Sequence, residues 1–319
     1  MQKKKVVILG GGNGGSISIR AMKQYIDQYD ISAVIAMSDS GSSSGQLRRE
    51  LGVLPPGDIL RAVLAMSRYD YDLLKRIFYD TRYSEKGKLQ GFGVGHLFIG
   101  LVEKYNGGIV DAVRALAQAL DVVGPVFPVT LESADLVAEL QDGTQVVGEH
   151  EIDRPTGPKE NRIVSCSLQP NPQGYDRALK EIREADVLLI GPGSFYASII
   201  ATLLPLGVKE AIAQSHAKLI FVSGNAVERA GELGPTSLSG FVSALEAYLP
   251  RPLDVVLYNR SILTESQRSF YDKKGWIPFL DDVYQVMRPC IAENYEKEEG
   301  GLDPDKLGEI IHIYIKDLV

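Results

Sequence analysis

The sequence of 319 residues predicts an α/β fold with three layers, in which a parallel sheet is flanked by helices and carries a small β-hairpin insert. Three observations favour this class. An apolar strand, a glycine-rich turn and a helical pattern follow one another at the start of the chain. Further apolar runs of strand length alternate with helical segments. A hairpin pattern interrupts this alternation near the middle of the chain.

Composition and charge limit the possible kinds of protein and of binding partner. Hydrophobic residues make up 45% of the chain and charged residues 24%, values typical of a folded protein with a large core. A net charge of −7 argues against a nucleic-acid surface, which needs clustered Lys and Arg. The apolar run Val6 to Leu9 is too short for a signal peptide, and no stretch approaches the length of a membrane span. The two cysteines, Cys166 and Cys290, are far apart in the sequence and have no metal-ligand spacing, so a disulfide framework is not expected. We therefore expect a cytoplasmic protein without a membrane span.

The first elements form a βαβ unit. Val6 to Leu9 reads as a strand and enters the glycine-rich stretch Gly10 to Ser16. Apolar residues then recur at helical spacing over about 15–27, and Ile31 to Met37 reads as a buried strand. This order is a Rossmann-like opening.

The next segment alternates loops of small residues with helices. The loop Ser38 to Arg49 ends the second strand, and a helix is predicted from Asp58 to about Ser67. Residues 70–120 carry mostly helical patterns, and the glycine-dense stretch Gly91 to His96 begins one of these helices.

A β-rich insert is predicted over about residues 122–168. Val122 to Thr130 is extended, and apolar runs flank Gln141-Asp142-Gly143, where an Asp-Gly turn indicates a hairpin. The α/β alternation then returns, with strands expected at Val187–Ile190, Lys218–Val222 and Leu253–Leu257 and strand-like alternation at Ile311, Ile313 and Ile315. No linker divides the chain, so a single domain over residues 1–319 is expected.

The first glycine stretch fits the dinucleotide fingerprint. Gly10, Gly12 and Gly15 have its spacing, and Asp39 follows the next strand, where a ribose-binding acid falls. The same pattern also occurs in glycine turns that only let a helix pack on a strand. The serine-rich loop after Asp39, which ends in Arg48 and Arg49, favours a phosphate or a metal-bound phosphate over a plain dehydrogenase site.

A second glycine loop, Gly191-Pro192-Gly193-Ser194, also joins a buried strand to a helix. Its N–H groups and the Ser194 hydroxyl would suit an anion, although Ser194 could equally be an ordinary helix N-cap. Two such loops at one sheet edge favour a ligand with a pyrophosphate group. The first loop is not a Walker A motif, because no Gly-Lys-Ser or Gly-Lys-Thr follows it.

Other polar residues have both a functional and a structural interpretation. Asp39 and Asp58 could bind a divalent cation such as Mg²⁺ or act as a base, while Asp58 could also cap its helix. His96 could contact a ligand or lie in the core. Asn225 could contact a base or sugar, or form an Asx-turn. The remaining histidines, His150, His216 and His312, belong to no recognisable constellation.

Together these motifs resemble those of the superfamily of the phospholactate transferase CofD and the gluconeogenesis factor YvcK, over residues from about 5 to 260. The matching stretches are Gly10–Gly14, with Asn13 in place of threonine, then Asp39–Arg48, Pro55–Ile59 and Gly191–Ser198. The sequence departs from the family pattern at Ser40, Gln46, Leu60, Arg61 and His96.

The resemblance implies a Rossmann-like core that binds a nucleotide at these loops. It allows two branches. The transferase branch moves a phospholactyl group onto a deazaflavin precursor, with a nucleoside-diphosphate-activated donor and magnesium. The YvcK branch is associated with UDP-sugar binding, cell-envelope homeostasis, cell shape and carbon metabolism. The Pro-Pro-Gly-Asp and Ser-Ser-x-Gly details favour the YvcK branch.

The prediction is therefore a non-catalytic, homo-oligomeric regulator that binds a nucleotide sugar. The alternatives are a magnesium-dependent transferase, with Asp39 as metal ligand or base, and an NAD(P)-dependent oxidoreductase. Asp39 and Asp58 are the predicted metal ligands. The predicted ligand-binding residues are Gly10, Gly11, Gly12, Asn13, Gly14, Ser16, Asp39, Ser42, Ser43, Ser44, Gly57, Asp58, His96, Gly191, Pro192, Gly193, Ser194 and Asn225.

Overall fold

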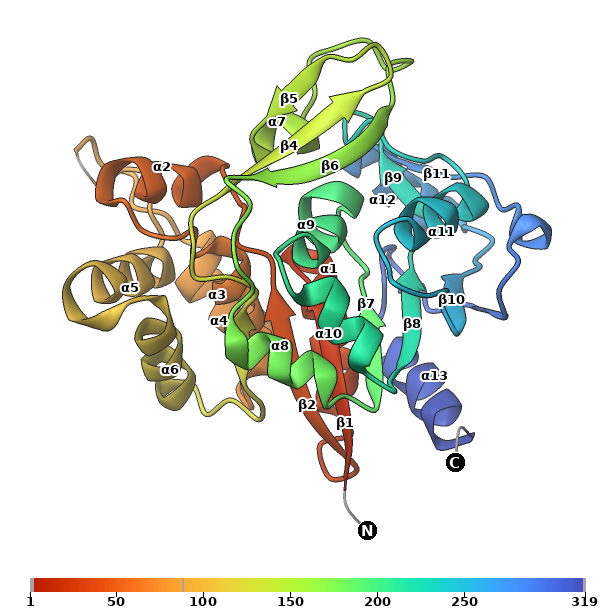
Figure 1. Ribbon diagram of the computed structural model, residues 1–319, viewed down its shortest axis with the longest axis horizontal. Helices are drawn as coiled ribbons and strands as arrows, with labels where there is room; N and C mark the ends of the chain where they lie inside the picture. Colours follow the sequence, from red (N-terminus) through yellow and green to blue (C-terminus); the bar gives the residue numbers. More distant parts are fainter. Residues whose placement is uncertain (1–2, 88, 318–319) are drawn as a thin grey trace.

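A seven-stranded parallel sheet forms the centre of the computed structural model, which describes residues 3–87 and 89–317; the side chains of Ser42 and Asp317 lie outside the described part (Figure 1). The strand order is β12-β10-β8-β7-β1-β2-β3, and each neighbouring pair is parallel. The strands are β1 Lys4–Gly10, β2 Tyr29–Ile35, β3 Val126–Pro128, β7 Val187–Ile190, β8 Lys218–Ser223, β10 Val255–Asn259 and β12 Cys290–Glu293.

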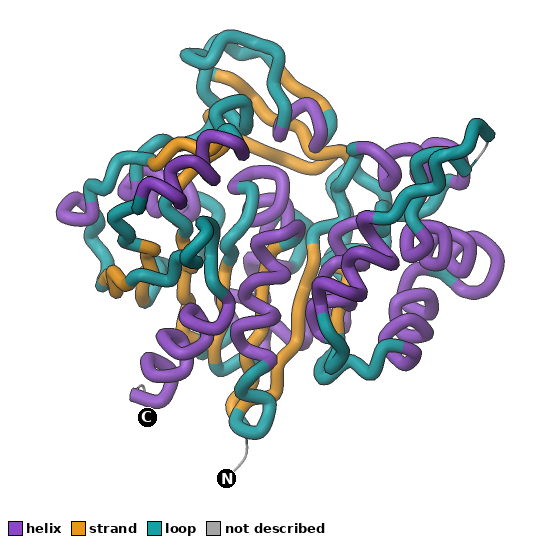
Figure 2. Tube along the Cα trace, turned by 180° about the vertical axis from the view of Figure 1, so that it is seen from behind, coloured by secondary structure: helices purple, strands orange, loops and turns teal. Residues whose placement is uncertain are grey.

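Helices cover both faces of this sheet, which confirms the three-layer fold. One face carries α8 Asp176–Arg183, α9 Ala201–Leu203 and α10 Val208–Gln214, in front in Figure 1. The other face, seen from behind in Figure 2, carries α1 Gly12–Lys23, α3 Gly57–Met66 and α13 Pro304–Asp317. None of the described helices is long and apolar enough to cross a membrane.

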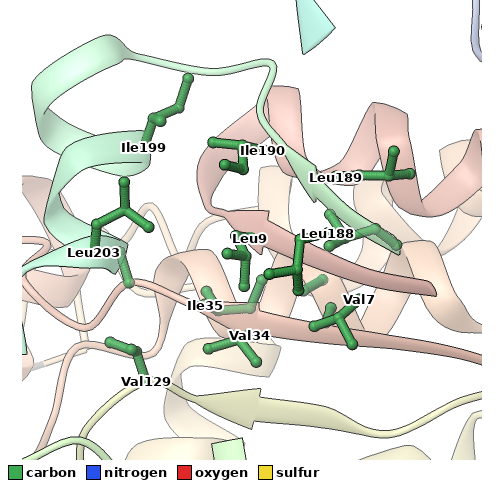
Figure 3. Close-up of a cluster of buried hydrophobic side chains, with 14 of the residues drawn as sticks. Val7, Leu9, Val34, Ile35, Val129, Leu188, Leu189, Ile190, Ile199 and Leu203 are labelled. Carbon is green, nitrogen blue, oxygen red and sulfur yellow. The ribbon is translucent and has the colours of Figure 1, made fainter. Parts of the chain in front are cut away.

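The core lies where the central strands meet these helices. Val7 and Leu9 of β1 lie beside Leu188 and Ile190 of β7, Val34 of β2 pairs with Leu9, and Leu203 of α9 belongs to the same cluster (Figure 3). All of these side chains are buried. Strands covered on both faces must be apolar at successive positions, which is why their sequences read as continuous hydrophobic runs.

The connection from β2 to β3 is helical, as predicted for residues 70–120. Its elements are α2 Ser42–Leu51, α3, α4 Tyr71–Leu74, the π-helix η1 Lys75–Asp80, α5 Val94–Val102, the π-helix η2 Glu103–Gly107 and α6 Ile109–Ala119.

The predicted insert is a three-stranded antiparallel sheet above the carboxyl ends of the main strands (Figure 1). Its strands are β4 Asp135–Leu140, β5 Gln145–Val147 and β6 Ile163–Gln169, and the short helix α7 Glu149–Asp153 follows β5. The insert is smaller than predicted, because β3 pairs with β2 in the main sheet. The sequence pattern over residues 122–130 indicates extended backbone but cannot tell which strand it pairs with.

The strand predicted at the C-terminal end is wrong. Ile311, Ile313 and Ile315 lie in helix α13, where Ile311 and Ile315 are buried and Ile313 is 53% exposed. Leu307 is buried one turn earlier, so the apolar positions recur every four residues, which is helical spacing. Between β8 and α13 the remaining elements are β9 Ala226–Glu228, α11 Leu238–Glu246, α12 Glu265–Lys274, β11 Trp276–Pro278 and the 3₁₀ turn η4 Val283–Gln285.

Candidate functional site

The two glycine loops meet at the carboxyl edge of the sheet, because they follow the adjacent strands β1 and β7. The Gly191 N–H donates to the Leu9 carbonyl at 3.0 Å, and the Ser18 hydroxyl donates to the Gly191 carbonyl at 2.7 Å. A Cβ atom at Gly14 would overlap the carbonyl group of Pro192. The chain leaves β1 toward β2 but leaves β7 toward β8, so the loops lie at the switch point where ligands of open parallel sheets bind.

A cavity of about 860 Å³ opens over these loops. Its floor includes Gly12–Gly14 and Pro192–Ser194, and helix α7 of the insert supplies part of its wall. Aromatic residues, among them Phe241 and Phe279, line another part. Small-molecule sites have volumes of roughly 300–1,000 Å³, so this cavity is large enough for a nucleotide.

The first loop presents the N-terminal end of a helix to the cavity. Helix α1 begins at Gly12, three residues earlier than predicted; its N-cap residue is Gly11, and the Asp58 carboxylate accepts a hydrogen bond from the Gly12 N–H. Gly12 has φ of 61°, a backbone conformation that favours glycine. The N-terminal end of a helix carries partial positive charge and free N–H groups, so it attracts anions. Gly12, Asn13 and Gly14, three of the predicted ligand-binding residues, line the cavity.

Three carboxyl groups gather next to this loop. Asp39 and Asp58 line the cavity as predicted, and Glu149 of α7 joins them. Burial and the charge of Asp39 raise the pKa of Asp58 to about 6. Burial and the charges of Asp39 and Asp58 raise the pKa of Glu149 to about 9. Bringing further negative charge here is unfavourable, so the cluster favours a bound cation or bound protons.

Arg61 is the cation beside this cluster. Its guanidinium lies 3.5 Å from Asp58 and 4.1 Å from the ring centroid of Tyr79. Its Nε is buried and has no hydrogen-bond partner among the described residues. Guanidinium groups suit phosphate, because several N–H donors point outward in one plane. The sequence analysis noted Arg61 only as a departure from the family pattern.

The carboxylates do not form a closed metal site. In the described ranges, no three His, Cys, Asp or Glu side chains are placed to hold a metal ion. Mg²⁺, however, usually binds through one or two carboxylates together with phosphate oxygens and water. Asp39 and Asp58 are therefore suited to a cation that arrives with a diphosphate.

The second loop differs from the prediction, because its helix end is already occupied. The helix begins at Phe195, in the π-helical segment η3 Phe195–Ile200, and the Ser194 side chain does not cap it. The Glu232 carboxylate takes that place: Oε2 accepts from the Phe195 N–H at 2.7 Å, and Oε1 accepts from the N–H groups of Tyr196 at 3.0 Å and Ala197 at 2.7 Å. Burial raises the pKa of Glu232 to about 7, although these hydrogen bonds partly oppose the shift.

The far end of the cavity, beyond the second loop, is aromatic. The ring centroids of Phe195 and Phe241 are 5.2 Å apart in an edge-to-face arrangement, and those of Phe241 and Phe279 are 5.1 Å apart. Trp276 also lines this end. Stacking of a base on an aromatic side chain contributes about 1–3 kcal/mol, so this end suits a nucleobase.

The insert is fastened over the cavity by polar contacts. The Ser40 N–H donates to Glu149 at 3.2 Å, and the His150 N–H donates to the Ser40 hydroxyl at 2.9 Å. Arg154 forms an ion pair with Glu228 at 3.1 Å. Ser40, a departure from the family pattern, therefore holds the insert in place. His150, which the sequence analysis assigned to no site, lines the cavity.

Several predicted residues lie behind the cavity wall rather than in it. The Ser43 hydroxyl donates to the Gly91 carbonyl at 2.7 Å, and the Ser44 hydroxyl accepts from the Gly57 N–H at 3.0 Å. The Ser16 hydroxyl donates to the Gly12 carbonyl at 3.0 Å. Ser42 begins α2, and its side chain is outside the described part. Gly10, Gly11 and Gly191 also lie outside the cavity lining, where they shape the two loops.

His96 and Asn225 are also structural here. His96 is buried against the Tyr79 ring, with centroids 4.9 Å apart, and burial and the charge of Arg82 lower its pKa to about 3. Asn225 accepts from the Tyr271 hydroxyl at 2.8 Å and donates to Ser261 at 2.8 Å. Neither side chain reaches the cavity.

Further expected contacts take structural roles as well. Asp58 does not cap its own helix, whose N-cap is Pro56. Arg48, expected near phosphate, pairs with Asp135 of the insert at 3.0 Å. Two other departures from the family pattern do not line the cavity: Gln46 donates to Glu50 on α2 at 2.7 Å, and Leu60 is fully buried.

Fold and site together define the class: a Rossmann-like α/β protein with a small-molecule cavity at the switch point of a parallel sheet. The family profile described as 2-phospho-L-lactate transferase CofD matches residues 6–294. A protein of Thermotoga maritima is 39% identical over 291 residues, which are 91% of this chain and 90% of that protein. A protein of Bacillus subtilis is 31% identical over 286 residues, 89% of this chain and 88% of that protein.

The names of both relatives contain the words gluconeogenesis factor. A crystal structure of a UPF0052-family protein from Bacillus halodurans has a TM-score of 0.88 and 29% identity, and the match covers 98% of this chain and 99% of that one. The chain belongs to the CofD family, among relatives named as gluconeogenesis factors. The resemblance inferred from the motifs is confirmed.

Proposed function

We propose that this protein binds a UDP-sugar in the cavity and acts as a cytoplasmic regulator that links carbon metabolism with cell-envelope homeostasis and cell shape. The observation that supports this most strongly is the polarity of the cavity. The N-terminus of α1, at Gly12–Gly14, follows β1 at one end, and the aromatic rings of Phe241 and Phe279 lie on the β8 side at the other. A nucleoside diphosphate has the same polarity, with phosphates at one end and a base at the other.

We expect a magnesium ion to bind in the cavity together with the diphosphate of the ligand rather than to the protein alone. The first loop lies beside Asp39 and Asp58, whose negative charges oppose a diphosphate and also raise the pKa of the neighbouring Glu149 to about 9. A divalent cation between these carboxylates and the phosphates would remove that repulsion. We therefore expect nucleotide affinity to rise when Mg²⁺ is present.

A thermal-shift and calorimetric screen tests the proposal. The ligands are UDP-N-acetylglucosamine, UDP, GDP, GTP and NAD, each with and without Mg²⁺. A ligand at a hundred times its Kd stabilises the fold by about 2.7 kcal/mol, which is readily measured. We expect UDP-N-acetylglucosamine with Mg²⁺ to give the largest shift. Stabilisation by NAD alone, or by no nucleotide, would refute the proposal.

A second candidate is a magnesium-dependent transferase that acts on a nucleoside-diphosphate-activated donor. The observation that favours it is the match to the transferase family over residues 6–294. Asp39 would hold the metal that stabilises the departing phosphate. The Asp39→Asn variant should then lose metal-dependent product formation, while Asp272→Asn, at an exposed position on α12, should retain it. Full activity in Asp39→Asn would exclude this role.

A further inference from the structure

Glu232 has one acceptor position in the cavity that no described residue uses. A carboxylate can accept about four hydrogen bonds. Within the described part of the chain, Oε1 takes the N–H groups of Tyr196 and Ala197, and Oε2 takes the N–H of Phe195 alone. Glu232 is partly exposed and lines the cavity. Its position is held by three backbone hydrogen bonds, so the remaining lone pair on Oε2 is pre-oriented for a ligand donor.

The order of the strands places Glu232 along the length of a bound nucleotide. The cavity lies across the ends of β8, β7, β1 and β2, which are successive neighbours in the sheet. Phe279 lies on the β8 side of the cavity, because its N–H donates to the carbonyl of Asn225, which follows β8, at 3.1 Å. Gly12–Gly14 follow β1, and Asp39 follows β2. Glu232 lies at the start of the helix that follows β7, between the aromatic end and the phosphate-binding end.

In a nucleotide the ribose stands between base and diphosphate. A base on the Phe241–Phe279 side and phosphates at Gly12–Gly14 would therefore bring the ribose over the β7 loop, beside Glu232. Asp39, the residue that the fingerprint assigned to the ribose, lies at the far side of the phosphate end, next to Asp58 and Glu149. The ribose-binding acid of this cavity is thus not the one that follows β2.

We propose that Glu232 determines specificity by accepting a hydrogen bond from a ribose hydroxyl group of the bound nucleotide. This inference rests on the proposed function, because it requires a nucleotide in the cavity. It assigns the ligand class as ribonucleotides with a free ribose diol. A nucleotide that lacks the ribose hydroxyl bound by Glu232 leaves this acceptor without a donor, and a phosphate on that hydroxyl meets a carboxylate instead of a cation.

Calorimetric titration of the full chain, with Mg²⁺ present, tests this assignment. The probes are UDP, 2′-deoxy-UDP and 3′-deoxy-UDP. We expect the wild-type protein to bind at least one deoxy probe about tenfold more weakly than UDP, since hydrogen bonds to charged groups have this strength. The Glu232→Ala variant should bind the three probes with similar affinities. Glu210→Ala, at an exposed position on α10, is the matched control and should keep the wild-type preference.

The measured quantity is the ratio of affinities within one variant, which does not depend on the folded fraction of the sample. Glu232→Gln serves as a second variant of nearly unchanged size, and we expect it too to reduce the preference for UDP. Equal binding of all three probes by the wild type would overturn the inference and leave nucleotide binding intact. An unchanged preference in both Glu232 variants would overturn it as well. No binding of any probe would refute the proposed function together with this inference.

Discussion

The two glycine loops have similar sequences and similar places in the fold, but different occupants. Each follows a buried strand, opens a helix and faces the same cavity. At the first loop the Asp58 carboxylate accepts a hydrogen bond from the Gly12 N–H, and Asn13 and Gly14 line the cavity beside it. At the second loop the Glu232 carboxylate accepts hydrogen bonds from three successive N–H groups. A glycine loop therefore predicts the shape of an anion site, but the rest of the fold decides whether the site is free.

The same comparison explains the different titration of the carboxyl groups. Glu232 receives three backbone hydrogen bonds, and its pKa rises only to about 7. Glu149, beside the first loop, receives one from Ser40, and the charges of Asp39 and Asp58 oppose its ionisation, so its pKa rises to about 9. The second loop thus binds one carboxylate through three successive N–H groups, whereas the first loop has one such hydrogen bond, to Asp58, within a cluster of carboxyl groups that a cation or protons would neutralise.

The largest effect is expected from breaking the contact between the loops with Gly14→Ala. The new methyl group would overlap the Pro192 carbonyl group, so the two loops must separate. Overpacking of this kind costs about 1–3 kcal/mol of unfolding free energy. We also expect nucleotide affinity to fall at least tenfold, because the N–H groups of α1 move away from the cavity floor. Urea unfolding and calorimetry measure the two effects.

The matched control for this variant is Gly157→Ala. A Cβ atom at Gly157 meets no other group, and the residue has no positive φ. We expect its unfolding free energy to stay within about 0.5 kcal/mol of the wild type and its nucleotide affinity to be unchanged. If Gly14→Ala behaves like this control, the contact between the loops does not organise the site.

The second prediction distinguishes the carboxyl groups beside the two loops by the pH dependence of the unfolding free energy. A carboxyl group with a raised pKa binds its proton more tightly in the folded state, so protonation stabilises the fold and stability is lost as pH rises through the folded pKa. Asp58 and Glu232 complete this change near pH 6 and 7, and Glu149 near pH 9. Without ligand, stability should fall between pH 7.5 and 9, by at most about 1.4 kcal/mol per pH unit for one proton.

The Glu149→Gln variant should remove most of this decline, because an amide does not ionise. Glu151→Gln, at an exposed position on the same helix α7, should retain it. Chemical unfolding at several pH values gives the slopes. A decline of equal size in wild type and Glu149→Gln would show that another group titrates in this window.

Much of the fold could be predicted because its signals are local. Val187–Ile190 followed by Gly191 reads as a buried strand that ends in a turn, whatever the rest of the chain does. Likewise, the turn at Asp142-Gly143 specifies its own hairpin. The strand prediction was wrong at Ile311 and Ile315. The alternation of three isoleucines indicates a strand when it is considered alone, but the buried Leu307 lies one turn earlier and extends the pattern to helical spacing.

The site was less predictable, because half of it is assembled from distant segments. Glu232 lies 37 residues after the N–H of Phe195 that it accepts from, in a loop without a motif. Glu149 and His150 reach the cavity only because the insert folds over the carboxyl end of the sheet (Figure 1). Ser44 and His96, in contrast, lie in suggestive motifs, but their side chains are buried among structural contacts. The identity of a residue does not reveal which way the fold turns it.

The third prediction has the smallest expected effect on the unfolding free energy and tests which group caps the helix after the second loop. It compares two serines that each precede the first residue of a helix. Ser237, the N-cap of α11, accepts from the Gly240 N–H at 3.2 Å, so Ser237→Ala should cost about 1 kcal/mol of unfolding free energy. Ser194 precedes the helix at Phe195 without such a bond, so Ser194→Ala should stay within about 0.5 kcal/mol of the wild type. Urea unfolding of both variants under one set of conditions measures the two changes in unfolding free energy. An equal cost at the two positions would mean that Ser194 caps its helix in solution. Glu232 could then move away from the N–H groups of the second loop, and these N–H groups could bind a phosphate of the ligand.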